Sequence, residues 1–153
     1  MTTPLDYVAI QNTISRYCFA LDTKDWALLT QVFLPDVDAK YPIGARSFVG
    51  LEPLSAAIQK RLTHITSQHA ITTQHIVIAE DGKTAKATSY FTGVHFGQGK
   101  WDGKEVTAWG RYIDDLVLVD GVSVPGASGQ WLIGAREVQF IKRLGEERVL
   151  EGE

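Results

Sequence analysis

Two histidines in β-rich runs are the side chains of this sequence best suited to move a proton. Side chains alternate along an extended strand, so His75 shares a face with Ile71 and Val77, and His95 shares one with Phe91. Both imidazoles are therefore predicted to point inward. Imidazole titrates near neutral pH, so an inward histidine oriented by a carboxylate can take a proton and return it. The alternative is a core histidine that donates to a backbone carbonyl.

Asp22 is a candidate carboxylate for such a role. It lies at the expected break between two helices, where aspartate is common as a helix N-cap. Tyr17 precedes it by about one helical turn, so both side chains can line the open end of one pocket. The sequence leaves the two roles of Asp22 open, and a cap can also be a catalytic partner.

Charged residues in the later strands have two readings each. Arg136 is flanked by apolar residues, so it either pairs with a carboxylate such as Asp114 or anchors a polar substrate. Arg111, Asp114 and Asp115 share one strand and are most simply surface pairs, because adjacent residues face opposite sides.

The histidines do not form a recognisable metal motif. His69, His75 and His95 have no HxH or HxxxH spacing. No phosphate loop or dinucleotide fingerprint is present in the sequence either. We therefore expect neither a metal site nor an organic cofactor.

Three helices and a set of strands must position these groups. Apolar residues at three- and four-residue spacing predict helices over about 4–21, 22–33 and 54–65, the first capped by Thr3 and the second ended by Pro35. Runs bounded by turn signals predict a short strand and then long ones, with a loop at 44–50. The expected strands are 36–42, 69–79, 84–97, 104–119 and 130–144.

The order of these elements predicts the fold class. Helices grouped first and strands grouped later indicate an α+β fold rather than a parallel βαβ sheet. We expect a cone-shaped α+β barrel in which three N-terminal helices pack in a strongly curved, mainly antiparallel sheet around a pocket. The 153 residues fit a single domain, 1–153, with flexible termini at about 1–4 and 146–153.

Composition excludes several classes of function. The net charge of −3 and the absence of a basic cluster argue against nucleic-acid binding. No apolar run approaches the roughly 18 residues of a membrane span, so the expected location is the cytoplasm without a membrane partner. The single cysteine, Cys18, lies in an apolar helical context typical of a buried, inert thiol.

Four segments together resemble the SnoaL-like branch of the nuclear-transport-factor-2-like superfamily. They are the Arg16–Trp26 hairpin, Thr73-Gln74-His75, Gly110-Arg111-Tyr112 and Gln130-Trp131-Leu132-Ile133. The resemblance covers nearly the whole chain. Within this family, Asp22, Tyr41, His75 and His95 resemble the pattern of scytalone dehydratases, and Tyr17, Asp22, His75 and Arg136 resemble that of bile-acid 7α-dehydratases.

The resemblance implies a cofactor-free lyase or isomerase of the dehydratase or cyclase type. A His75–Asp22 general base would remove a proton next to the carbonyl of a hydroxylated polyketide, terpenoid or steroid-like molecule. The catalytic set is expected to be His75, Asp22, His95 and Tyr17. The substrate is expected to contact Tyr41, Arg136, Tyr112, Phe91 and Trp26.

Two other functions occur on the same fold. A limonene-type epoxide hydrolase would use an arginine and two carboxylates to activate water, here Arg111, Asp114 and Asp115. A non-catalytic ligand-binding or dimerisation module would need no inward histidine and carboxylate pair. The family resemblance, together with Trp101, Trp109, Val117 and Val119, also predicts a homodimer or homotrimer.

Overall fold

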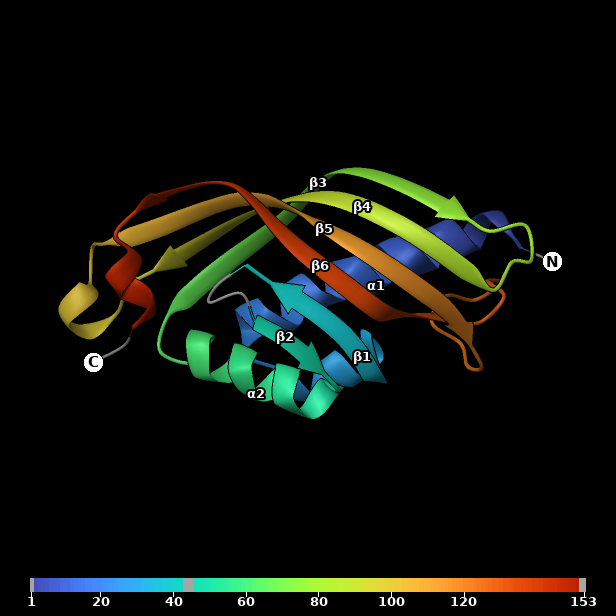
Figure 1. The fold of residues 1–153 in the computed structure, drawn as a ribbon, viewed down its shortest axis with the longest axis horizontal. Helices are drawn as coiled ribbons and strands as arrows, with labels where there is room; N and C mark the ends of the chain where they lie inside the picture. The colour runs from blue at the N-terminus through green and yellow to red at the C-terminus, as the bar shows by residue number, and fades with distance from the viewer. Residues whose placement is uncertain (1, 43–45, 152–153) are drawn as a thin grey trace.

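The computed structural model describes residues 2–42 and 46–151. Figure 1 shows a curved sheet whose concave side covers the helices. In chain order the elements are α1 (Pro4–Thr23), the 3-10 helix η1 (Trp26–Gln31), β1 (Phe33–Tyr41), β2 (Arg46–Val49), α2 (Leu51–Leu62), β3 (Thr66–Ile78), β4 (Thr84–Phe96), η3 (Gly99–Trp101), β5 (Glu105–Val119), β6 (Gln130–Gly145) and η4 (Glu147–Leu150). The expected α+β class is confirmed.

The first helix extends further than its sequence predicts. Thr3 and Asp6 form a capping box at its N-terminus, and Pro4 occupies the first turn. The helix ends after Thr23, where Lys24 adopts the left-handed conformation. Asp22 therefore lies in the last turn of α1 and is not an N-cap, which was one of the two roles that the sequence left open. Asp25 instead caps the short 3-10 helix that replaces the expected second α-helix.

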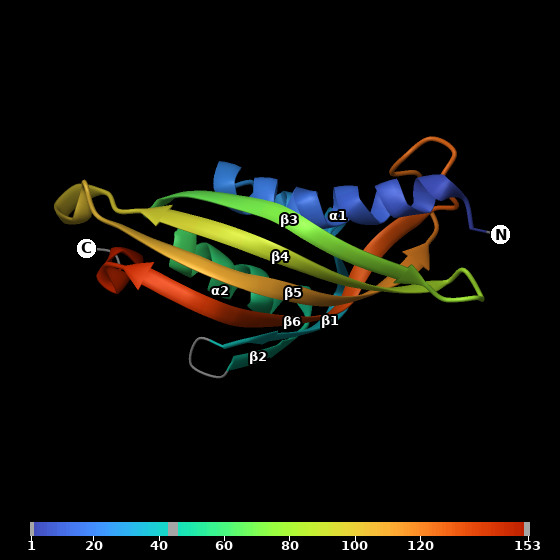
Figure 2. The same ribbon diagram turned by 90° about the horizontal axis from the view of Figure 1, so that it is seen from above.

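The strands of the described residues form one open, mixed sheet in the order β2-β1-β6-β5-β4-β3. β1 pairs with β6 in parallel, and the other neighbours are antiparallel. In the view from above, α1 runs beside β3 while α2 lies beneath the middle of the sheet (Figure 2). The loop expected at 44–50 is wrong for 46–49, which pair with β1 as β2, and its residues 44 and 45 lie outside the described residues.

A β-bulge in β3 decides which of its residues face the helices. The register with β4 shifts between Ile71 and Gln74. One extra residue there exchanges the two faces for everything that follows. Gln74 consequently points inward and donates to Ser89 Oγ at 3.1 Å, whereas His75 is exposed on the outer face of the sheet.

The core fills the space between α1, α2 and the concave face of the sheet. Its fully buried side chains include Ile10, Ile14, Leu54 and Trp131. Cys18 is also buried there, and burial raises the pKa of its thiol to about 12. No helix within residues 2–42 and 46–151 is long and apolar enough to cross a membrane.

The C-terminal segment packs against the rest of the domain. Val149 and Leu150 of η4 are buried, and the backbone oxygen of Leu150 lies 3.3 Å from His64 Nε2. Residues 147–150 form a packed 3-10 helix, and Thr3 and Pro4 start α1, while the flexibility of the termini stays a prediction. Residues 1, 152 and 153 lie outside the described part of the chain.

Asp6 should make the stability of this protein depend on pH in the acid range. Burial raises the pKa of its carboxyl, but hydrogen bonds from Thr3, Trp131 and Ser128 outweigh that effect and lower the pKa to about 2, from its usual 3.8. A carboxyl with a lowered folded-state pKa stabilises the fold above its unfolded pKa, and this stabilisation is lost as the pH falls.

Urea unfolding is therefore expected to show stability falling between about pH 4 and pH 2. The matched variant Asp6→Asn should be less stable at neutral pH and should lose part of this acid dependence. An unchanged slope in Asp6→Asn would show that other carboxyl groups account for the acid dependence.

Candidate active site

A cavity of about 390 Å³ lies on the concave side of the sheet, bounded by α2 and the end of α1. Its wall combines aromatic, aliphatic and imidazole groups with cationic ones. The lining residues are Tyr17, Leu21, Tyr41, Arg46, Phe48, Leu54, Ala57, Ile58, Lys60, Arg61, Leu62, His64, His69, Phe91, His95, Tyr112, Val138, Phe140, Arg143, Leu150 and Glu151.

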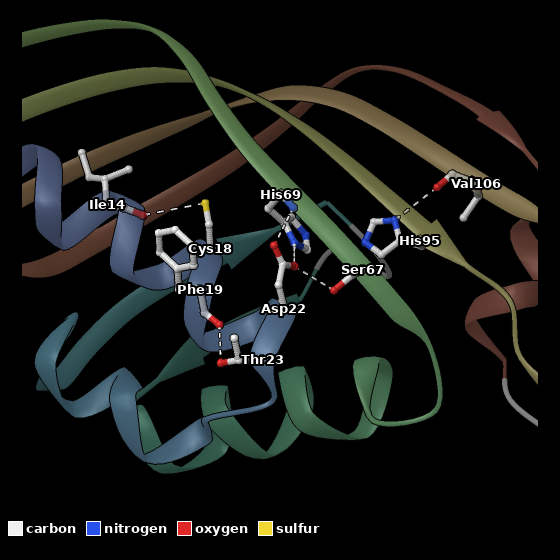
Figure 3. Close-up of polar contacts among 9 residues, drawn as sticks. All are labelled: Ile14, Cys18, Phe19, Asp22, Thr23, Ser67, His69, His95 and Val106. Atoms are coloured by element: carbon white, nitrogen blue, oxygen red, sulfur yellow. Dashed lines mark hydrogen bonds and ion pairs between the residues drawn. The ribbon is translucent and has the colours of Figure 1, made fainter.

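Asp22 and His69 form a clamped pair at the wall of this cavity. The Oδ1 atom of Asp22 lies 2.7 Å from His69 Nδ1 and accepts from Ser67 Oγ at 2.8 Å. Its Oδ2 atom accepts from the backbone N–H of His69 at 2.8 Å. Figure 3 shows the carboxylate at the end of α1 directed at β3, where these three donors meet.

The hydrogen bonds keep Asp22 ionised. Burial raises the pKa of its carboxyl, but the bonds from His69 and Ser67 outweigh burial, so the pKa is lowered overall. A carboxylate can only accept, so Nδ1 of His69 carries the hydrogen of their bond. Nε2 then keeps a lone pair that can take a proton. Together the two residues have the chemistry of an oriented general base.

The predicted partnership between Asp22 and His75 is wrong. His75 follows the β3 bulge and is exposed on the outer face, whereas His69 precedes it and lines the cavity. His69 entered the sequence argument only as a possible metal ligand. With His75 on the other face, the three histidines cannot converge. Among residues 2–42 and 46–151, no three His, Cys, Asp or Glu side chains gather as metal ligands.

His95 lines the same cavity beside His69, as the sequence predicts for an inward histidine. The ring centroids are 5.3 Å apart, and His95 Nδ1 lies 3.3 Å from the backbone oxygen of Val106. Burial, reinforced by the neighbouring His69, lowers the pKa of His95 to about 3. His95 is therefore neutral at physiological pH and can hydrogen-bond a substrate without carrying charge.

Gly93 gives the two histidines the room they occupy. It pairs with His69 across the β3–β4 ladder. A Cβ atom added at Gly93 would lie 3.0 Å from His69 Cδ2, 3.2 Å from His69 Nε2 and 3.4 Å from His95 Cε1. Such contacts are tighter than ordinary packing, so the added methyl group must push the imidazole of His69. Gly93 is thus a positioning residue for the pair.

Gly93→Ala is expected to lower kcat by up to about 10-fold, since the imidazole must move by a few tenths of an ångström and a displacement of about 1 Å costs roughly 100-fold. KM and the melting temperature should change little. The matched control Thr92→Ala, on the neighbouring residue of the outer face, should leave kcat unchanged. Equal kcat values for Gly93→Ala and the unmodified protein would mean that His69 tolerates the displacement.

Aromatic side chains form the floor of the cavity. The hydroxyl groups of Tyr17 and Tyr41 are 2.9 Å apart, and the ring of Tyr112 stacks on Phe91 with centroids at 4.3 Å. Burial raises the pKa of Tyr17, Tyr41 and Tyr112, so all three phenols stay protonated. The structure thus brings these four predicted residues to the same cavity as His69 and His95.

Arg136 lies behind the aromatic floor and does not line the cavity. Its Nε donates to Asp114 Oδ1 at 2.7 Å and its Nη2 donates to Oδ2 at 2.8 Å, with both side chains fully buried. The guanidinium also stacks on Tyr112 and Tyr17, at 4.1 and 4.3 Å from the ring centroids. Of the two readings of Arg136, the structure favours the ion pair with Asp114 over the substrate anchor.

Two other predicted groups do not assemble at the cavity. Trp26 lies in η1, where its ring is 6.0 Å from Lys24 Nζ, and it does not line the cavity. Asp114 faces inward, whereas Arg111 bonds Gln139 and Asp115 pairs with Lys86 on the outer side. Asp114 therefore lies on the opposite face of the sheet from Arg111 and Asp115, so the three groups of the epoxide hydrolase alternative do not converge.

Comparison with known sequences identifies the family. A sequence profile described as the SnoaL-like domain matches residues 3–137. The chain belongs to the SnoaL-like family. No curated protein sequence matches this SnoaL-like protein. The family and its fold are thus shown, while the reaction is left to the geometry of the site.

Solved structures share the fold of this SnoaL-like protein at low sequence identity. A candidate aromatic ring hydroxylase from Novosphingobium aromaticivorans is 23% identical, with a TM-score of 0.79 over 98% of this chain and 99% of the other. A candidate scytalone dehydratase from the same organism is 19% identical, with a TM-score of 0.77 over 94% and 89%. The hexachlorocyclohexane dehydrochlorinase LinA-type3 from Novosphingobium barchaimii is 12% identical, with a TM-score of 0.74 over 93% and 90%.

Proposed function

We propose that this SnoaL-like protein is a cofactor-independent lyase or isomerase in which His69, oriented by Asp22, is the general base. The observation that carries the proposal is the set of hydrogen bonds to Asp22, whose two oxygens accept three hydrogen bonds from β3 while His69 lines the cavity. A pair held this way needs no rearrangement before proton transfer. The names of the scytalone dehydratase and dehydrochlorinase neighbours support an elimination reaction.

In the proposed reaction, His69 Nε2 takes a proton from the carbon next to a substrate carbonyl. Electrons of the broken C–H bond move to the carbonyl oxygen and form an enolate. Both phenols of the Tyr17–Tyr41 pair are protonated, and one hydroxyl donates to the other. The accepting phenol keeps a free O–H, which donates to the enolate oxygen. Asp22 stabilises the imidazolium that forms on His69.

The proton on His69 then has two destinations. In a dehydration the enolate re-forms the carbonyl as the C–O bond at the β-carbon breaks, and the departing hydroxide takes the proton and leaves as water. In an isomerisation the proton returns to another carbon of the same molecule. Both reactions are balanced and need no oxidant or reductant. The neutral His95 can hold a substrate hydroxyl group in place by a hydrogen bond.

Hydroxylated polycyclic ketones of a volume suited to the cavity are the proposed test compounds. The unmodified protein should consume at least one of them, and in D2O the recovered ketone or product should carry deuterium at the carbon next to the carbonyl. His69→Ala should bind the same ketone and show neither event. Binding without turnover by the unmodified protein across the panel would favour a ligand-binding module.

We also propose that the protein assembles into a homodimer or homotrimer. Tyr90, Trp109 and Ile141 of the outer β4–β6 surface are 43%, 36% and 57% exposed, and such apolar surface is commonly covered by a second copy. Light scattering at micromolar concentration should give two or three times the mass of the 16.9 kDa chain. A mass of one chain would contradict this proposal.

A further inference from the structure

The cavity wall carries an excess of positive charge that the proposed proton transfer does not use. Among the residues that the structure describes, the cavity is lined by the four cations Arg46, Lys60, Arg61 and Arg143 and by one carboxylate, that of Glu151. This contrasts with the whole chain, whose net charge is −3. A positive cavity wall in an acidic protein favours an anionic ligand.

Arg61 is the member of this group with the most unused binding capacity. The guanidinium of Arg143 already donates to the carboxylate of Glu147, and it lies 4.7 Å from the Phe140 ring centroid. Arg61 is half-buried in the last turn of α2 and forms no hydrogen bond or ion pair with residues 2–42 or 46–151. Burial, together with the charge of Arg143, lowers the pKa of Arg61 to about 10, so it is still charged at neutral pH.

The charges of Arg61 and Arg143 also reach His95. Burial lowers the pKa of His95 first of all, and the neighbouring His69, Arg61 and Arg143 lower it further. Arg61 and Arg143 therefore lie close enough to His95 to affect its titration, and His69 lies next to His95. Phe91 and Phe140 supply apolar wall to the same cavity.

We propose that the substrate is an organic acid whose carboxylate binds Arg61 while its ring system lies against Phe91 and places the reacting carbon at His69. This rests on the proposed function and specifies its substrate class. A planar guanidinium offers two parallel N–H donors to a carboxylate, and charge-assisted bonds of this kind are stronger than neutral ones. The acid would complete the hydrogen bonding that Arg61 lacks within the described residues.

Binding of 2-naphthoate and 2-naphthamide, which differ in the charge of one group, tests this proposal without turnover. Titration calorimetry at low ionic strength should give 2-naphthoate at least about tenfold the affinity of the amide, consistent with one charge-assisted hydrogen bond. Arg61→Met should abolish that preference, and Arg61→Lys, which keeps the charge, should retain most of it.

Lys142→Met is the matched control, since it removes one charge from the exposed neighbour of Arg143 outside the cavity wall. It should keep the preference for the acid, and melting curves will show that each variant is folded. Equal affinities, no binding of 2-naphthoate, or an acid preference that survives Arg61→Met would overturn the proposal. Because His69→Ala should keep the acid preference, a failure of the proton-transfer mechanism is distinguishable from a failure of this inference.

Discussion

Asp22→Asn and His69→Ala are each expected to lower the rate of the chemical step by about 10²–10⁴, the usual loss when a general acid–base group is removed. His69 supplies the basic nitrogen. Asp22 fixes its ring and stabilises the imidazolium through the 2.7 Å contact to Nδ1. Single-turnover kinetics on a ketone found in the substrate panel measures this step directly.

The double variant separates a coupled pair from two independent residues. If Asp22 acts through His69, Asp22→Asn/His69→Ala should be little slower than either single variant. Multiplicative losses would mean that Asp22 acts on the substrate in its own right. His75→Ala is the matched control, because His75 lies in the same strand but is exposed on the outer face, and it should retain the full rate. A large loss in His75→Ala would contradict the assignment of His69.

Arg136→Met should destabilise the protein by about 3–5 kcal/mol, the usual cost of leaving one member of a buried ion pair alone. Burial raises the pKa of Asp114, and the two hydrogen bonds from Arg136 oppose that rise and satisfy both carboxylate oxygens. Without Arg136 the carboxyl has no compensating charge. The lost stacking on Tyr17 and Tyr112 adds to the cost. Urea unfolding measures the change.

The matched variant Arg136→Met/Asp114→Leu removes both charges and should recover much of the lost stability, because no uncompensated charge remains. Steady-state kinetics of that double variant then tests whether Arg136 has a direct role in catalysis. A folded double variant with unchanged KM and only a modest loss of kcat fits a supporting role behind the aromatic floor. A large rise in KM would mean that Arg136 contacts substrate after all.

The sequence predicts most of the fold because its periodicities reflect burial. The apolar spacing of α1 and the alternation in β4 and β5 correspond to faces that pack on the core, and the turn signals mark the ends of the long strands. What it missed lies at short elements. β2 is four residues long and η1 is a 3-10 helix, so neither has enough residues to show a period.

The sequence predicts the candidate site as a set of inward-facing residues. The β-bulge in β3 then makes His69, rather than His75, the proposed general base. Tyr17, Asp22 and His95 reach the site because the faces of α1 and β4 follow their periods without interruption. In β3 the bulge after Ile71 exchanges the two faces of the strand. The residues at the bulge, Thr72 and Thr73, do not indicate it in the sequence. Alternation counted from the start of the strand would have placed Ser67, His69 and Ile71 together.

The buried thiol of Cys18 makes this protein a convenient host for spectroscopic probes. It is the only cysteine of the chain, and with its pKa near 12 the thiolate that alkylating reagents need is scarce at neutral pH. A cysteine introduced at an exposed position such as Val77 would therefore take up a maleimide dye or spin label selectively, with the native residue left in place. Pairs of such labels would report distances across the sheet while the cavity stays unmodified.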